Sequence, residues 1–242
     1  MNKRTFAVVA LLLAAGLAQA QVDDRARELL EGMNPGRGAG EVTTLDQTMT
    51  MTLYNDGDEL VTTMRMVIDF PGKRAAAVSE IEGMATTMVH QDGATVMKID
   101  GMSLPVPPGM DSLFDGAFDH DGLANLLDDP DAVATYDGVV SYADVLAGHQ
   151  VTYTGDFGVP GAGIDASTIR WVFDDSGRLI GQVVPAEGTD LVYVFTGEPK
   201  VEGGLFYDAD IYEVSGGAAT PFGSVRYESV TINEPIDESL FR

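Results

Sequence analysis

The feature that most constrains the fold is a strict two-residue alternation between residues 48 and 70. Apolar side chains take every second position on both sides of an Asn-Asp-Gly sequence: Met49, Met51, Leu53, Met64, Met66, Ile68 and Phe70. Successive side chains of a strand point to opposite faces, and Asp-Gly sequences favour tight hairpin turns. The segment therefore predicts an antiparallel hairpin with one apolar face, turning at residues 55–57.

Strand-like runs separated by turns rich in Gly, Asp and Pro recur along most of the chain. They fall at residues 73–81, 85–90, 94–100, 151–154, 168–174, 178–184, 190–196, 205–214 and 224–232. With the first hairpin they predict about ten or eleven short strands. Short strands joined by short turns favour one curved antiparallel sheet or open barrel, in a single domain, over two domains. The expected class is mainly β, with a small α component.

Two segments depart from the strand pattern. Residues 22–33 carry apolar side chains at helical spacing, with Asp23 or Asp24 available as the cap and Asn34-Pro35-Gly36 as the stop. This predicts a short N-terminal amphipathic helix. Residues 111–147 carry apolar clusters broken by Gly and Pro, and they predict a helical insertion that serves as a plug or lid.

The first twenty residues have the pattern of a secretory signal peptide. Lys3 and Arg4 precede an apolar run over residues 6–18, and Ala18-Gln19-Ala20 fits a cleavage site. A membrane-spanning helix needs roughly 20 apolar residues, so an uncleaved anchor is the weaker interpretation. The chain contains no cysteine, and therefore neither a lipid-attachment cysteine nor a disulfide. We expect cleavage after Ala20 and an exported, soluble domain over residues 21–242.

The charge balance limits the partners that the chain can bind. Asp and Glu number 38 against 14 Lys and Arg, giving a formal net charge of −24. Nucleic acids and anionic membranes are both bound through clusters of Lys and Arg, so we expect neither as a partner. High charge of one sign also favours solubility and a monomer.

The sequence contains no recognisable catalytic motif. It has no cysteine nucleophile, no G-x-S-x-G and no H-E-x-x-H, and its three histidines, His90, His120 and His149, are isolated from one another. The glycine-rich residues 36–40 follow a helix stop and open no helix, so they fit a linker better than a phosphate loop. We therefore expect no enzyme and no cofactor.

One acidic stretch was considered as a metal site. If Gly122 is the sixth position of a calcium loop, Ala117 and Asp128 occupy the first and twelfth positions, where Asp and Glu are required. The pattern fails at both ends, and we expect no metal. Irregular calcium binding through Asp128, Asp129 and Asp131 is the alternative to a solvated acidic loop.

The order of the segments and the end of the chain carry a family resemblance. The matching features are the N-terminal helix, a Pro71-Gly72-Lys73-Arg74 turn, an Asp92-Gly93 turn followed by Val96 and Met97, and the closing sequence YESVTINEPIDESLF over residues 227–241. Over nearly the whole chain after residue 20, the protein resembles the outer-membrane lipoprotein carrier superfamily (LolA/LolB-like). The resemblance implies a periplasmic protein whose unclosed antiparallel barrel, plugged by helices, receives acyl chains. Residues 111–147 do not align with the family's plug helices, and Arg65 and Arg170 are candidates for the cavity arginine that latches the lid in some members.

The candidate ligand-binding residues are apolar and lie on strands. They are Met49, Met51, Leu53, Met64, Met66, Ile68, Met88, Met97, Trp171 and Phe173. Methionine is flexible and polarisable, so a methionine-rich face can adapt to ligands of different shape. Ordinary core packing is the alternative for each of these residues taken singly.

These observations leave one favoured function and two alternatives. The favoured function is a carrier that holds acyl chains of lipids or lipoproteins in its barrel and exchanges them with a membrane-bound donor or acceptor complex. The first alternative is an envelope sensor or interaction module of the same fold, which binds lipidated or misfolded proteins without transport. An exported enzyme with an unrecognised site is the third.

Overall fold

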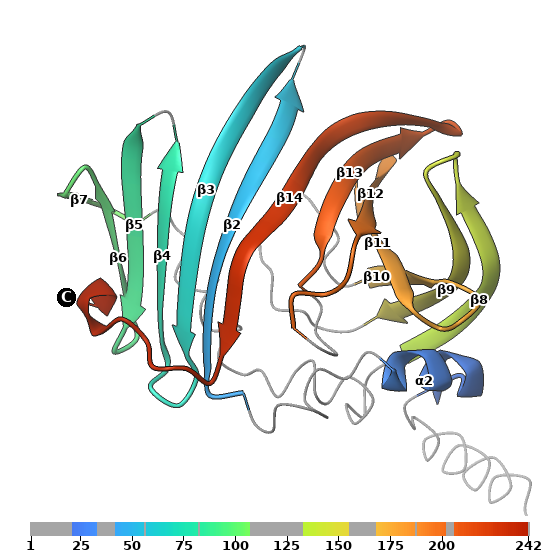
Figure 1. The fold of residues 1–242 in the computed structure, drawn as a ribbon, viewed down its shortest axis with the longest axis horizontal. Helices are drawn as coiled ribbons and strands as arrows, with labels where there is room; N and C mark the ends of the chain where they lie inside the picture. The colour runs from blue at the N-terminus through green and yellow to red at the C-terminus, as the bar shows by residue number, and fades with distance from the viewer. Residues whose placement is uncertain are drawn as a thin grey trace, which may run out of the picture.

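The structure is a computed structural model that describes residues 21–32, 42–55, 57–81, 83–106, 133–154, 168–186, 188–201 and 206–241. These residues form one α-helix, one short 3-10 helix and a single fourteen-stranded sheet (Figure 1). The expected signal peptide, residues 1–20, lies outside the described residues.

The helices and strands have the following bounds, in chain order: β1 (Gln21–Val22), α2 (Asp24–Glu31), β2 (Thr44–Asn55), β3 (Asp58–Asp69), β4 (Arg74–Ile81), β5 (Met84–Gln91), β6 (Ala94–Ile99), β7 (Met102–Leu104), β8 (Val133–Tyr142), β9 (Leu146–Thr154), β10 (Thr168–Phe173), β11 (Leu179–Ala186), β12 (Thr189–Thr196), β13 (Asp208–Ser215), β14 (Ala218–Ile232) and η1 (Glu238–Phe241).

The strand order is β1-β8-β9-β10-β11-β12-β13-β14-β2-β3-β4-β5-β6-β7. Every neighbouring pair is antiparallel except β1 with β8, which is parallel. The outermost strands β1 and β7 do not pair with each other, so within the described residues the sheet is not closed. This confirms the expected unclosed antiparallel sheet. The strand count exceeds the prediction because β1 and β7 are too short to show a pattern in sequence, and because β8 lies where helices were expected.

The predicted helical insertion over residues 111–147 is wrong in its described part. Residues 133–147 form β8, a tight turn and the start of β9. The two strands pair from Val133 opposite Thr154 to Tyr142 opposite Leu146. A bulge beside Gly138 shifts the register and breaks the simple two-residue pattern that would have indicated a strand. Residues 111–132, the rest of the predicted insertion, lie outside the described residues.

The predicted N-terminal helix is confirmed as α2. The Asp23 carboxylate accepts hydrogen bonds from the Arg25 and Ala26 amides, which caps the first turn. Ala26, Leu29 and Leu30 form the buried side of the helix and pack against the sheet. Within the described residues, no helix is both long and apolar enough to span a membrane.

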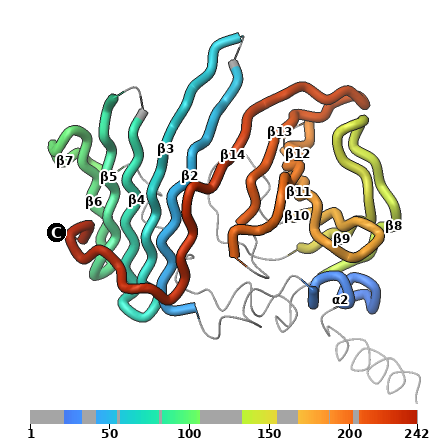
Figure 2. The backbone as a smooth tube through the Cα atoms, viewed as in Figure 1, coloured from blue at the N-terminus to red at the C-terminus, as the bar shows by residue number. Residues whose placement is uncertain are grey.

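The two halves of the sheet differ in shape. Strands β8–β13 curl round toward α2, whereas β2–β7 spread as an open fan, and the long strand β14 links the two halves (Figures 1 and 2). A bulge between Tyr227 and Ser229 lies within β14, where it pairs with β2. Near the other end of that pair, a Cβ atom on Gly223 would lie only 2.3 Å from the Thr52 carbonyl oxygen, so the close approach of the two strands requires glycine.

Candidate functional site

The predicted methionines come together on one face of the sheet. In the β2–β3 pair, Met49 lies directly opposite Met64, and Met51 lies opposite Thr62. Residues directly opposite each other in an antiparallel pair share a face. The alternation of β2 places Leu45, Gln47 and Leu53 on this same face. The first hairpin therefore has the apolar face that its sequence predicts.

The same face continues across the fan. From β3 to β6 the register places Met66 opposite Ala77, Ala77 opposite Met88, and Met88 opposite Met97. One row of side chains thus runs across five strands, from Gln47 to Met97. We call this surface the methionine face and define it by six residues: Met49, Met51, Met64, Met66, Met88 and Met97.

The methionine face is only partly buried. Met49 is 8% exposed, whereas the other five methionines have intermediate exposure. Beside them Met84, at 51% exposed, and Met102, at 66% exposed, continue the same alternation on β5 and β7. Thioether side chains that are not fully packed retain the freedom to rearrange around an apolar ligand.

Two further predicted residues flank or extend this site. Ile68 is 7% exposed and belongs to a buried cluster with Leu45 and Ala75, at the end of the methionine face where β2 begins. Leu53 is half-buried toward the β2–β3 turn. The four methionines of the β2–β3 hairpin therefore lie between its buried end and its more open end.

Trp171 and Phe173 lie in a different part of the sheet. Both are on β10, where they are 2% and 0% exposed. They share a buried cluster with Leu29 and Leu30 of α2, and the Trp171 ring lies 5.6 Å from that of Tyr153. The structure thus does not bring them beside the methionine face: strands β11–β14 intervene.

A buried polar side chain lies among the methionines, and the sequence analysis missed it. Gln47 is 3% exposed, faces Met66 across the β2–β3 pair and faces Val230 of β14 on its other side. Its Oε1 atom has no hydrogen-bond partner among the described residues. An unsatisfied buried acceptor costs about 1–3 kcal/mol. The signal was present in the sequence, because Gln47 interrupts an otherwise apolar alternation.

His90 also lies on this side of the sheet, in the row that contains Leu45 and Ile68. It is 3% exposed, and its Nδ1 lies 2.9 Å from the Thr95 hydroxyl. A histidine that precedes a turn, as His90 does, is expected to be a solvated surface residue, and for His90 this expectation is wrong. The alternation along the strand before the Asp92-Gly93 turn could have placed His90 on the same face as Met88.

Both candidate latch arginines lie on the opposite face of the sheet. Arg65 alternates with Met64 and Met66, and its guanidinium forms two hydrogen bonds to Asp46, at 3.1 and 2.7 Å. These bonds, with the nearby Asp237, raise the pKa of Arg65. Arg170 alternates with Trp171 and donates to Asp190 at 3.0 Å. Neither arginine is placed to contact a ligand on the methionine face.

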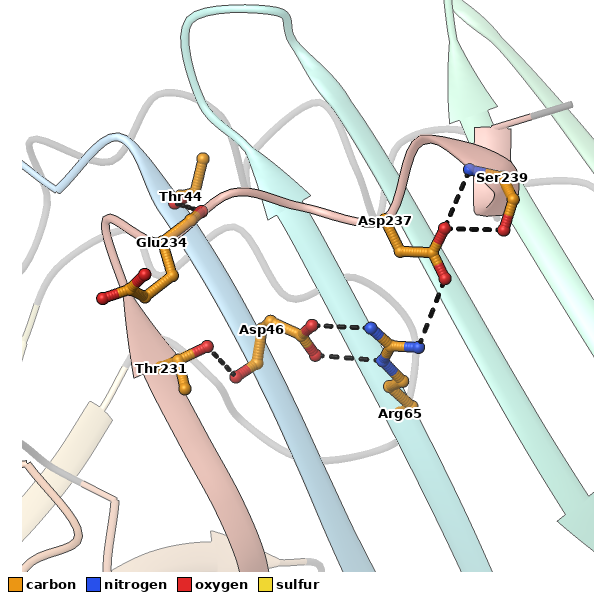
Figure 3. Close-up of polar contacts among 7 residues, drawn as sticks. All are labelled: Thr44, Asp46, Arg65, Thr231, Glu234, Asp237 and Ser239. Carbon is orange, nitrogen blue, oxygen red and sulfur yellow. Dashed lines mark hydrogen bonds and ion pairs between the residues drawn. The ribbon is translucent and has the colours of Figure 1, made fainter.

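Arg65 instead helps to hold the closing segment of the chain (Figure 3). Its guanidinium lies 3.8 Å from Asp237, which also accepts hydrogen bonds from the Ser239 amide and hydroxyl. Asn233 has a positive φ of 60°, and its side chain accepts from the Thr43 amide at 2.7 Å. The closing sequence that carries the family resemblance thus begins as the end of β14, and its residues 233–241 fold back over the outer side of the sheet.

A tyrosine, a histidine and an aspartate form a hydrogen-bonded chain that has the composition of a proton relay. The Tyr136 hydroxyl lies 2.7 Å from His149 Nδ1, and His149 Nε2 lies 3.1 Å from the Asp175 carboxylate. Sequence analysis treated His149 as isolated, because its partners are 13 and 26 positions away. Tyr136 packs against the main buried cluster.

The described residues contain no group of three or more His, Asp or Glu side chains that could hold a metal ion. The acidic residues considered for calcium, from Asp119 to Asp131, lie outside the described residues, as does His120. That these acidic residues bind no metal therefore stays a prediction.

Comparison with protein-family models and with curated proteins finds no match. Comparison with solved structures finds a DUF1329 family protein from Desulfovibrio piger at a TM-score of 0.53, with 9% identity over 92% of this chain and 98% of that one. A LolA superfamily protein from Nitrosomonas europaea matches at a TM-score of 0.48, with 12% identity over 90% and 97%. A putative outer membrane lipoprotein-sorting protein domain from Vibrio parahaemolyticus matches at 0.44, with 11% identity over 89% and 97%.

These similarities concern the fold. The chain shares its overall fold with the DUF1329 family protein along nearly the full length of both.

Proposed function

We propose that this protein is a periplasmic carrier that binds the acyl chains of lipids or lipoproteins on its methionine face. One observation carries the proposal: six methionines from four strands share one face of an unclosed sheet, and five of them are only half-buried. Each methylene that an alkyl chain buries there would contribute about 0.8 kcal/mol.

The carrier would act by binding and release, without bond chemistry. The methionine face supplies thioether and aliphatic groups rather than a nucleophile and a base. Tyr136 and His149 are on β8 and β9, Asp175 is in the turn between β10 and β11, and Tyr136 packs into the core. Cargo would be received from, or passed to, a membrane-bound complex.

Native mass spectrometry of the protein purified from its own envelope, followed by lipid extraction, tests this proposal. We expect bound acyl species on the wild type and their loss from the double variant Met51→Asp plus Met88→Asp, because two carboxylates would enter the apolar face. The matched control is Thr52→Asp plus Thr87→Asp, which changes the neighbouring residues of the same strands on the opposite face.

Circular dichroism must first show that both double variants are folded. Retention of cargo by the control and its loss from the methionine variant would support the carrier. A wild type that carries no lipid and takes up no fluorescent acyl chain would overturn it, and would move the sensor or interaction module to first place.

A further inference from the structure

We propose that Gln47 is the polar anchor of the ligand site, and that the cargo carries a hydrogen-bond donor attached to its alkyl chain. A hydroxyl group and an amide N–H both satisfy this chemistry. The inference rests on the proposed function and narrows it, because a chain that ends in an ester or ether alone has no donor to offer.

The surroundings of Gln47 are those of a ligand contact. Met49 follows it on the same face of β2, Met66 lies opposite it on β3, and Val230 lies opposite it on β14. The side chain is buried among apolar neighbours, yet Oε1 finds no donor among the described residues. A group on the ligand that lies along the methionine face would meet this acceptor.

A second buried glutamine shows how the same chain satisfies an amide that has only a structural role. Gln150, at 6% exposed, accepts from the Tyr142 hydroxyl at 2.5 Å and donates to Asp137 at 2.7 Å. Buried polar groups are normally paired in this way. Gln47 has no such acceptor contact, although methionine would fill the same volume without an unmet hydrogen bond.

The position of Gln47 also orients the cargo. It lies near the start of β2, beside the buried cluster of Leu45 and Ile68, while Leu53 lies toward the more exposed β2–β3 turn. Leu53 lies six positions after Gln47 on the strand, a span of about 20 Å. The donor group would therefore bind at the buried end, with the alkyl chain running along Met49 and Met51 toward the turn.

Two matched pairs of ligands test the donor requirement by calorimetric titration of the whole mature protein. The first pair is hexadecan-1-ol and its methyl ether, and the second is N-methylhexadecanamide and N,N-dimethylhexadecanamide. Each pair differs by one donor hydrogen that a methyl group replaces. In at least one pair, we expect the wild type to bind the member with the donor hydrogen about tenfold more tightly than the methylated member. The pair that shows this preference identifies the donor group of the cargo as a hydroxyl or an amide.

The variant Gln47→Met should bind both members of each pair equally, because it removes the acceptor and keeps the volume. Without ligand it should unfold at a higher urea concentration than the wild type, since it removes an unmet acceptor. The control Gln91→Met removes another buried unpartnered Oε1, but from the opposite face, so it should keep the preference.

Several results would contradict the role of Gln47 as the anchor. Equal binding of both members by the wild type, or a preference that survives Gln47→Met, would overturn the anchor and leave the carrier proposal standing. A lower unfolding midpoint for Gln47→Met would show that the amide has a structural partner, and would also overturn it. Failure to bind any of the four ligands would remove the carrier proposal and this inference together.

Discussion

Arg74 and Glu238, 164 positions apart, are joined by two hydrogen bonds of 2.7 Å each, so the start of β4 holds the C-terminal helix η1 against the sheet. The same guanidinium donates to Asp69 at 2.7 Å and lies 4.6 Å from the centre of the Phe241 ring. Arg74, on the outer face, thus holds both the turn between β3 and β4 and the end of the chain.

The first prediction concerns this attachment. Glu238, and then Asp69, raise the pKa of Arg74, which therefore stays charged throughout the accessible pH range. We expect Arg74→Ala to lower the free energy of unfolding by about 1–2 kcal/mol, because it breaks bidentate bonds that are only partly exposed. Urea denaturation at low and high salt provides the measurement.

Arg178 offers the control for Arg74. Its side chain is 53% exposed, and its contacts with Asp174 and Glu198 are both 3.4 Å long. Its replacement by alanine should cost less than about 1 kcal/mol. Equal losses from the two variants would show that the closing segment is not held by Arg74.

The second prediction concerns pH. The Asp174 carboxylate accepts from the Ser176 hydroxyl at 2.6 Å and from the Ser176 and Arg178 amides at 2.9 and 3.0 Å, and these bonds lower the pKa of Asp174. Since the folded pKa lies below the unfolded value of about 3.9, the stabilisation is present above that value and is lost as the pH falls through the folded pKa.

Asp174→Asn isolates this effect, because asparagine keeps an acceptor oxygen and removes the charge. The variant should be less stable than the wild type at neutral pH, and the difference should shrink as the pH falls below about 4. Thermal unfolding followed at a series of pH values measures it. A difference that stays constant down to the acid limit would refute the assignment.

The third prediction uses Trp171, the only tryptophan in the chain. A hexadecanol with bromine on its alkyl chain quenches indole fluorescence on contact. We expect little quenching of Trp171 at saturation, because its indole is 2% exposed, packs with α2, and is separated from the methionine face by β11–β14.

Met88→Trp combined with Trp171→Phe supplies the positive control, since it moves the indole onto the methionine face. That variant should be strongly quenched by the same ligand. Strong quenching of the wild type would instead extend the ligand site to Trp171 and Phe173, as the sequence analysis predicted.

The alternation of the first hairpin predicted both its turn and the shared face of its methionines. It could do so because successive side chains of a strand point to alternate faces, so the pattern can be read from a few consecutive residues. The same reasoning failed at residues 133–147. There a bulge beside Gly138 offsets the pattern, and the strand is defined by its pairing with β9 rather than by its own sequence.

The arrangement of the candidate residues was predicted in part. The six methionines do share a face, but Trp171 and Phe173 pack into a separate buried cluster, and Gln47 and His90 were not recognised. The alternation of their own strands could have placed Gln47 and His90, but the position of Trp171 and Phe173 depends on strand order, which contacts between residues far apart in the chain decide. The pairing of β14 with β2, which joins the two halves, links residues near 47 with residues near 230.

The sequence by itself determined the mainly β class, the capped N-terminal helix, the first hairpin and the charge that disfavours anionic partners, because period, capping and net charge are local or additive properties. Only the tertiary structure decided that Trp171 and Phe173 pack away from the methionine face, that Arg65 and Arg74 hold the closing segment on the outer face, and that the Gln47 acceptor is unmet. Those features depend on which distant segments come together, because hydrogen-bond partners and packing neighbours are not set by the order of residues along one strand.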